Sequence, residues 1–320
     1  MTLPRRIYYT LVFSTLTLQA ACFVSKNNHI LRAIKMNESS ASSSYGEDLD
    51  QMGMMESDML ICVDRNDVPV GKMSKKQAHQ FTPETPRGFV HRAFSVFIFN
   101  DKGEMLLTKR ASSKITFPNV WTNACCSHPL WGQTPNEVDD KPVESYPGGQ
   151  PPGIKYAAIR KLKHELGIEK NDIELDRMRF LTRFHYWAAD SVTYSQESCP
   201  WGEHEIDYVL FLQYPDSNVQ PQIFANPDEV GEYKYVSIDE MKKMMQEDND
   251  LLWSPWFRGI MERCGFAMWE NLDEALTSKS SFYNTEIEFF DPPEEHTAFF
   301  NLPEHTANTG VLLKDESPIL

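Results

Sequence analysis

The chain has 320 residues, of which 41% are hydrophobic and 12% aromatic. This composition can bury a sizeable core and excludes a wholly disordered protein. The net charge of −15 argues against a general nucleic-acid binder. The six cysteines are scattered and form no CxxC pair, which argues against a disulfide scaffold and against a structural zinc site.

The charge is unevenly distributed and divides the chain into four parts. Residues 1–35 carry five bases and no acids, residues 36–57 carry five acids and no bases, and residues 273–320 carry ten acids and two bases. We therefore expect a targeting segment at 1–35, a disordered acidic and Ser-rich linker at 36–57, one folded domain at 58–272, and an acidic, weakly structured tail at 273–320.

The first 35 residues have the layout of a targeting segment. Arg5 and Arg6 precede an apolar run from Ile7 to Val24, and a basic, Ser-rich stretch follows. With about 18 residues, the run is marginal for a membrane span and resembles a signal or transit segment. The pattern favours import into a plastid or mitochondrion, with cytoplasm and peroxisome as alternatives. No membrane attachment is expected for the mature domain.

Predicted strands and helices alternate irregularly along residues 58–272. Alternating or apolar runs predict strands at 59–63, 91–100, 105–110, 178–187, 206–214 and 233–236. Helical spacing and capping residues predict helices at 154–166, after Ser237, and at 253–272. The strands 91–100 and 105–110 are expected to form a hairpin, and the Pro- and Gly-rich residues 131–153 a surface insertion. Intermixing without a strict βαβ repeat indicates an α+β protein or an α/β/α sandwich.

Three histidines and two glutamates are candidate metal ligands: His79, His91, His128, Glu203 and Glu205. Neutral imidazole and carboxylate ligands suit a five- or six-coordinate Mn, Mg or Zn site. On a strand, the Glu-His-Glu sequence places both carboxylates on one face. Taken singly, each of these residues is more often an ordinary surface or core residue.

Three basic residues, Lys75, Arg110 and Lys114, stand out in an otherwise acidic domain. They could neutralise a phosphate-bearing ligand. A Lys-Arg pair at the end of a hairpin is, however, also typical of a solvated sheet edge.

The adjacent residues Cys125 and Cys126 lie close in sequence to Trp121 and His128. A thiol packed beside these groups and a metal could donate or accept a proton once its pKa is shifted. The alternative is a buried loop with two inert cysteines.

Taken together, these segments resemble the type I isopentenyl-diphosphate delta-isomerases. The two signature segments are TNACCSHP at residues 122–129 and WGEHEIDY at residues 201–208. The likeness also includes residues 75–79, 91–97 and 107–114, and it ends near residue 272. The segments follow one another in the correct order.

The resemblance implies a Nudix-type α/β/α sandwich with a mixed sheet, an added N-terminal strand and metal-ligand segment, and an added C-terminal helix. The positions that match a degenerate Nudix helix are Arg160, Leu162, Glu165, Gly167 and Ile168. Lys161 and His164 stand where Nudix hydrolases keep glutamates, so the carboxylates that would gather magnesium and activate water are missing. A Nudix-type (nucleoside) diphosphate hydrolase is therefore the weaker alternative. A catalytically inactive Nudix-like binding module is a third hypothesis.

The implied activity is isomerisation of isopentenyl diphosphate to dimethylallyl diphosphate through a tertiary carbocation. In that interpretation Cys126 and Glu205 face each other across the substrate, and Tyr186 supports proton transfer at Glu205. Trp256 covers the hydrocarbon. The small-molecule substrate is the expected partner, and the protein is expected to be a monomer or weak dimer.

The resemblance also implies two kinds of bound ion. The three histidines with Glu203 and Glu205 would enclose one divalent metal, either Mg²⁺, Mn²⁺ or Zn²⁺. Glu165 would hold a second ion, a Mg²⁺ that arrives with the diphosphate. Lys75, Arg110 and Lys114 would bind the diphosphate oxygens.

Overall fold

The computed structural model describes Tyr45, residues 50–82, 85–195, 198–246 and 251–292, and His296. The predicted targeting segment, most of the predicted linker and the end of the predicted tail lie outside the described residues. The chain divides into residues 1–47 and 48–320, and the description below concerns the second unit. In the described part of the chain, no helix has the length and apolar character required to cross a bilayer.

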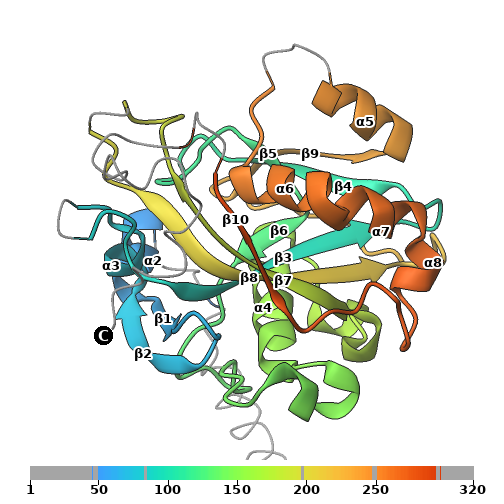
Figure 1. Ribbon diagram of the computed structural model, residues 1–320. Helices are drawn as coiled ribbons and strands as arrows, with labels where there is room; N and C mark the ends of the chain where they lie inside the picture. Colours follow the sequence, from blue (N-terminus) through green and yellow to red (C-terminus); the bar gives the residue numbers. More distant parts are fainter. Residues whose placement is uncertain are drawn as a thin grey trace, which may run out of the picture. The chain divides into compact units, whose positions relative to one another are not determined.

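A mixed sheet lies at the centre of this unit (Figure 1). Its main path is β10 (Ile287–Phe290), β7 (Arg179–Ala189), β8 (Gly202–Gln213), β3 (His91–Phe99), β1 (Met59–Val63) and β2 (Pro69–Ser74). Four further strands lie off this path. The strands β4 (Met105–Arg110) and β6 (Cys125–Ser127) pair with β3, and the strands β5 (Trp121–Thr122) and β9 (Val230–Val236) pair with β4. The central strands β3 and β8 are buried along nearly their whole length, as expected of strands covered on both faces.

Helices complete the unit. They are α2 (Gln51–Ser57), α3 (Lys75–His79), α4 (Pro152–Leu166), α5 (Ile238–Gln246), α6 (Pro255–Ile260), α7 (Phe266–Glu270) and α8 (Leu272–Ala275). A π-helical turn, η5 (Met261–Gly265), joins α6 to α7. Short 3-10 turns lie at η1 (Val143–Ser145), η2 (Pro147–Gly149), η3 (Lys170–Asp172) and η4 (Leu175–Arg177).

Two hydrophobic clusters lie on opposite faces of the sheet. Phe94, Val96 and Ile98 of β3 belong to the cluster that contains α4. The alternate residues Phe97 and Phe99 belong to the cluster that contains α6 and α7. Because successive side chains of a strand point to opposite faces, the sheet lies between two helical layers. The predicted α/β/α sandwich with a mixed sheet is confirmed.

The predicted helix at 154–166 begins two residues earlier, at Pro152, and ends where expected. Gly167 follows it with a φ of 67°, and its N–H bonds back to the last turn. This left-handed conformation suits glycine and satisfies carbonyls at the helix end. Ser237 also caps the next helix, because its Oγ accepts from the Glu240 N–H at 3.2 Å.

The predicted hairpin of 91–100 with 105–110 is confirmed only next to its turn, where β3 and β4 pair antiparallel. Within the described residues, β3 and β4 align through the single pair Phe99 and Met105. β3 instead pairs in parallel with β8 and antiparallel with β6, while β4 pairs with β9. A strand that is apolar on both faces buries more apolar surface in the middle of a sheet than in a two-stranded hairpin.

Three other boundaries differ from the sequence prediction. The expected linker ends before α2, whose first turn is capped by the Asp50 side chain and whose Met54 and Met55 are buried. The expected weak tail contains β10, which pairs with β7. Residues 131–153 are more than a surface insertion, because the buried Asp139 carboxylate accepts the first N–H groups of α4. The sequence prediction rested on the acidic or Pro-rich composition of each segment, and this composition does not indicate the few apolar and capping residues that the fold uses.

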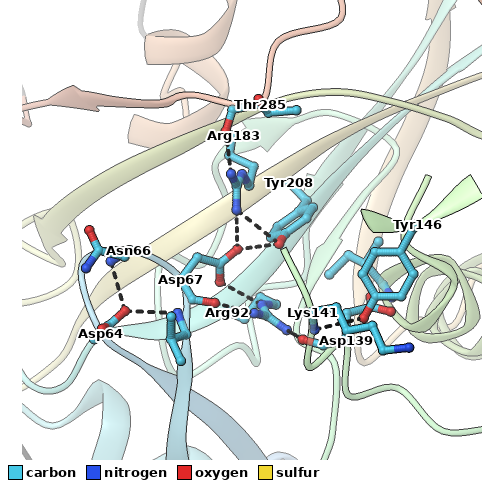
Figure 2. Close-up of polar contacts among 12 residues, drawn as sticks. Asp64, Asn66, Asp67, Arg92, Asp139, Lys141, Tyr146, Arg183, Tyr208 and Thr285 are labelled. Atoms are coloured by element: carbon cyan, nitrogen blue, oxygen red, sulfur yellow. Dashed lines mark hydrogen bonds and ion pairs between the residues drawn. The ribbon is translucent and has the colours of Figure 1, made fainter. Parts of the chain in front are cut away.

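A buried polar network ties the connection between β1 and β2 to three central strands, as Figure 2 shows. Asp67, in the left-handed region with a φ of 64°, accepts from Arg92 of β3 at 2.8 Å and from Arg183 of β7 at 2.6 Å. The Tyr208 hydroxyl of β8 donates to the same carboxylate. Aspartate tolerates this backbone conformation better than most residues. The network therefore holds β3, β7 and β8 at one point.

We predict that Asp67→Ala destabilises the fold. Two buried guanidinium groups would lose their carboxylate, a change that costs about 3–5 kcal/mol when one partner of a buried ion pair is removed. Urea unfolding followed by circular dichroism measures the free energy of unfolding. The control is Asp101→Ala, on an exposed turn, which removes a carboxylate without uncovering a buried charge. Equal losses in the two variants would contradict the prediction.

Candidate active site

The pairing register of β8 places Glu205 beside residues of the two neighbouring strands. In the parallel pairing of β3 and β8, Glu205 lies beside His91. In the antiparallel pairing of β7 and β8, it lies beside Tyr186. Glu203, two residues earlier, shares its face of the strand, and His204 stacks against His185 instead. The predicted orientation of the Glu-His-Glu segment is confirmed.

Five buried side chains form a compact cluster at this point. Their potential ligand atoms all lie within 4.8 Å of one another. His79 Nε2 is 2.7 Å from Glu203 Oε2, and His128 Nε2 is 2.8 Å from Glu205 Oε1. His91 completes the group, with its ring centroid 4.6 Å from that of His79. These are the five residues that the sequence nominated as metal ligands.

Backbone carbonyls orient two of the imidazoles. His79 Nδ1 lies 2.8 Å from the Lys75 carbonyl and His91 Nδ1 lies 2.8 Å from the Phe89 carbonyl. A carbonyl only accepts, so each Nδ1 carries the proton and each Nε2 presents its lone pair to the cluster. Among the described residues, the buried Nε2 of His91 has no hydrogen-bond partner. A buried lone pair of this kind, beside two carboxylates, fits a divalent metal.

Electrostatics keep the cluster in metal-binding form. Burial lowers the pKa of His79 and of His128, so both are neutral at pH 7. Burial acts to raise the pKa of Glu203, but its interactions with the neighbouring His79 and His128 act in the opposite direction, and the pKa is lowered. Neutral imidazoles and ionised carboxylates are the forms that bind metal.

Cys126 and Glu205 each carry a specific hydrogen-bond partner. The Cys126 thiol donates to Asn123 Oδ1 at 2.9 Å, and the Trp256 indole donates to Cys126 Sγ at 2.8 Å. Burial raises the pKa of Cys126 to about 12, so the thiol keeps its proton. The Tyr186 hydroxyl donates to Glu205 Oε2 at 2.5 Å. The structure thus supplies a protonated thiol and a buried carboxylate, two groups suited to acid–base chemistry.

Both groups line one pocket, which also contains four basic side chains. The lining residues are Lys75, Arg110, Lys114, Thr116, Cys126, Ser127, His128, Lys161, Glu165, Tyr186, Glu203, Glu205 and Trp256. The pocket therefore brings a thiol and a carboxylate together with several positive charges. All the predicted site residues line the pocket except His79 and His91, which belong to the same histidine–glutamate cluster as the lining residues His128, Glu203 and Glu205.

Two charged residues in contact with lining residues of the pocket were not nominated by the sequence. Lys161 Nζ lies 3.1 Å from Glu165 Oε1, one turn away on α4, and this i, i+4 spacing could have indicated it. Glu229 lies 2.5 Å from Lys114 Nζ and carries no local sequence signal. Burial lowers the pKa of Lys114 to about 8 even with Glu229 beside it.

Comparisons with known proteins decide the family. A NUDIX domain model matches residues 140–257. An isopentenyl-diphosphate delta-isomerase of Gibberella zeae is 41% identical over 247 residues, which cover 77% of this chain and 89% of the relative. The chain belongs to the isopentenyl-diphosphate delta-isomerase family. The isopentenyl-diphosphate delta-isomerase of Schizosaccharomyces pombe is 42% identical over 242 residues, 75% of this chain and 93% of that protein.

A plant member of the same family is similarly close. The isopentenyl-diphosphate Delta-isomerase I, chloroplastic, of Arabidopsis thaliana is 37% identical over 259 residues, which cover 80% of this chain and 81% of that protein. The Nudix-hydrolase alternative is not favoured. Lys161, where hydrolases keep a glutamate, contributes a cation to the pocket of this isomerase-family chain.

We predict that metal binding at the histidine–glutamate cluster weakens only at acidic pH. Because the pKa values of His79 and His128 are lowered, protons should compete with the metal below the ordinary imidazole pKa of about 6.5. Titration of chelator-treated protein with Mn²⁺ at several pH values, followed by calorimetry, measures the affinity. Affinity should be constant from neutral pH down to that value and fall below it. A decline centred above pH 6.5, or unchanged affinity in His128→Ala at pH 7, would contradict the prediction.

Proposed function

We propose that this chain converts isopentenyl diphosphate to dimethylallyl diphosphate. The observation that carries the proposal is that the Cys126 thiol, the Glu205 carboxylate and four basic side chains line the same pocket. Moving the double bond requires a proton at the terminal carbon and loss of a proton from the neighbouring methylene. Two acid–base groups on opposite sides of a tertiary carbocation can do this if water is kept out. The names of the relatives support the same reaction.

Glu205 is the proposed acid–base group on the β8 side. Its carboxylate is buried, and Tyr186 donates to one of its oxygens. The hydroxyl fixes the orientation of the carboxylate and stabilises its ionised form between proton transfers. His128 and His91 face the other oxygen. The carboxylate can therefore hold or release a proton without changing its position.

Cys126 is the proposed group on the β6 side. Asn123 is fixed by its own amide, which donates to the carbonyls of Val96 and Cys125. Its Oδ1 therefore points at the thiol and holds that proton in one direction. When the thiol has lost its proton, the N–H of Trp256 remains to stabilise the sulfur.

Trp256 is the proposed cover of the hydrocarbon. Its side chain is buried against Phe117, with ring centroids 5.4 Å apart in an edge-to-face arrangement. An aromatic face beside a carbocation stabilises it by roughly 0.5–2 kcal/mol. The same packing excludes water, which would otherwise trap the cation.

The four basic residues are the proposed diphosphate site. Arg110 is oriented by bonds to the carbonyls of Thr116 and Phe117. Lys75, Lys114 and Lys161 supply further positive charge in the same pocket. A bound diphosphate would raise the pKa of Lys114 above about 8, because an anion favours the charged ammonium. The local charge thus opposes the acidic average of the chain.

Two ions complete the proposal. His79, His91, His128, Glu203 and Glu205 would hold a divalent metal, Mg²⁺, Mn²⁺ or Zn²⁺, whose charge would stabilise the ionised carboxylates. Glu165, in the pocket wall beside Lys161, would hold a Mg²⁺ that arrives with the diphosphate.

We predict that Cys126→Ala and Glu205→Gln each lower kcat by about 10²–10⁴-fold or more, because each removes one acid–base group. Binding of isopentenyl diphosphate should persist, since the four basic residues are intact. Product formation is measured by mass spectrometry and binding by calorimetry, with Mg²⁺ present.

The matched control is Cys125→Ala. Cys125 precedes Cys126 on β6, but its side chain lies in the hydrophobic cluster on the α4 face and contacts Glu165. This variant keeps both acid–base groups and should stay active. Near-normal turnover in Cys126→Ala or Glu205→Gln would contradict the mechanism. Release of inorganic phosphate in place of dimethylallyl diphosphate would indicate the hydrolase alternative.

A further inference from the structure

The strand β10 lies beside β7 (Figure 1), and β7 bears Tyr186, the proposed partner of Glu205. In this parallel pairing, Phe290 is aligned with Tyr186. The two rings stack with centroids 5.1 Å apart and planes inclined by 5°. Phe290 is only 4% exposed. A residue from the acidic C-terminal region is thus packed against the side chain that orients Glu205.

The outer edge of the same ring lies close to α6. A Cβ atom added to Gly259 would lie 2.6 Å from Phe290 Cζ and 2.7 Å from Cε2, so glycine is the residue that leaves room for this ring. Gly259 lies about one turn after Trp256, which donates to the Cys126 sulfur. Phe290 therefore lies between the element that bears Tyr186 and the element that bears Trp256.

We propose that Phe290 is a positioning residue for the isomerisation. Its ring holds Tyr186 so that the hydroxyl meets Glu205, and it sets the position of α6 so that the Trp256 indole meets Cys126. Removal of the ring leaves a cavity between two elements, and both can move into it. The proposal rests on the proposed function, because it assigns a role in the same reaction.

The neighbouring residue Phe289 provides a matched control. It belongs to the same strand but packs on His185, with centroids 5.0 Å apart, and it is 38% exposed. Loss of either ring weakens the attachment of β10 to β7. Only loss of Phe290 uncovers Tyr186 and α6. A role limited to anchoring the strand would make the two alanine variants alike.

The first test compares Phe290→Ala, Phe290→Leu and Phe289→Ala in the full chain, with kcat and KM for isopentenyl diphosphate. Misplaced catalytic groups lower kcat steeply, so we expect a loss of roughly tenfold or more in Phe290→Ala. KM should stay nearly constant, because the basic residues are not touched. Phe290→Leu should recover part of the loss, and Phe289→Ala should turn over like the wild type.

The second test uses the contact between Phe290 and Gly259. Gly259→Ala favours the helix but forces the new methyl group into the Phe290 ring, so we expect kcat to fall. The double variant Gly259→Ala with Phe290→Leu should be faster than Gly259→Ala alone, because the shorter side chain relieves the clash.

The outcomes separate the two proposals. An active wild type with equal kcat in Phe290→Ala and Phe289→Ala would overturn the positioning role alone. So would a rise in KM without a fall in kcat, or effects of Gly259→Ala and Phe290→Leu that simply add. A wild-type chain that makes no dimethylallyl diphosphate would overturn the proposed function, and the positioning role with it.

Discussion

The register of β8 is the constraint on which the site depends. Pairing on one side aligns Glu205 with His91, and pairing on the other aligns it with Tyr186. A shift of one residue would turn Glu203 and Glu205 to the opposite face of the strand. The Asp67 network and the two hydrophobic clusters fix this register, because each ties β8 to its neighbours. The fold thus supports the chemistry through strand alignment rather than through one long loop.

Burial then determines the protonation state of the thiol and the imidazoles in the site. Away from water, the Cys126 thiol keeps its proton and the histidines lose theirs. The glutamates beside those histidines stay ionised. Glu229 partly neutralises Lys114 and Lys161, two of the basic residues that line the pocket. The chain's net charge of −15 therefore says little about the pocket, where basic side chains lie close together.

The sequence predicted those features of the fold and site that depend on local residue patterns. The Glu-His-Glu alternation fixed which side chains share a face, and the four-residue spacing with Gly167 located α4. Residue types nominated the five candidate metal ligands and the Cys125–Cys126 pair, and the resemblance to a known family chose Cys126 as the acid–base group. Asn123 and Lys161 were not nominated although their contacts with Cys126 and Glu165 are local in sequence. Glu229 was not nominated because its contact with Lys114 joins distant segments. The short extent of the β3–β4 hairpin was not predicted either, because β3, buried on both faces, also pairs with β6 and β8. The C-terminal strand was hidden by its acidic composition, although Phe290 is buried against Tyr186.

The central claim is that two separate groups, Cys126 and Glu205, exchange protons with the substrate. The most direct measurement is turnover of isopentenyl diphosphate in D₂O, with the position of deuterium in the product read by NMR. Two groups that exchange with solvent should place deuterium in the newly formed methyl group and release the methylene proton to solvent. Dimethylallyl diphosphate that contains no solvent deuterium would show transfer of one proton within the substrate, and it would contradict the account.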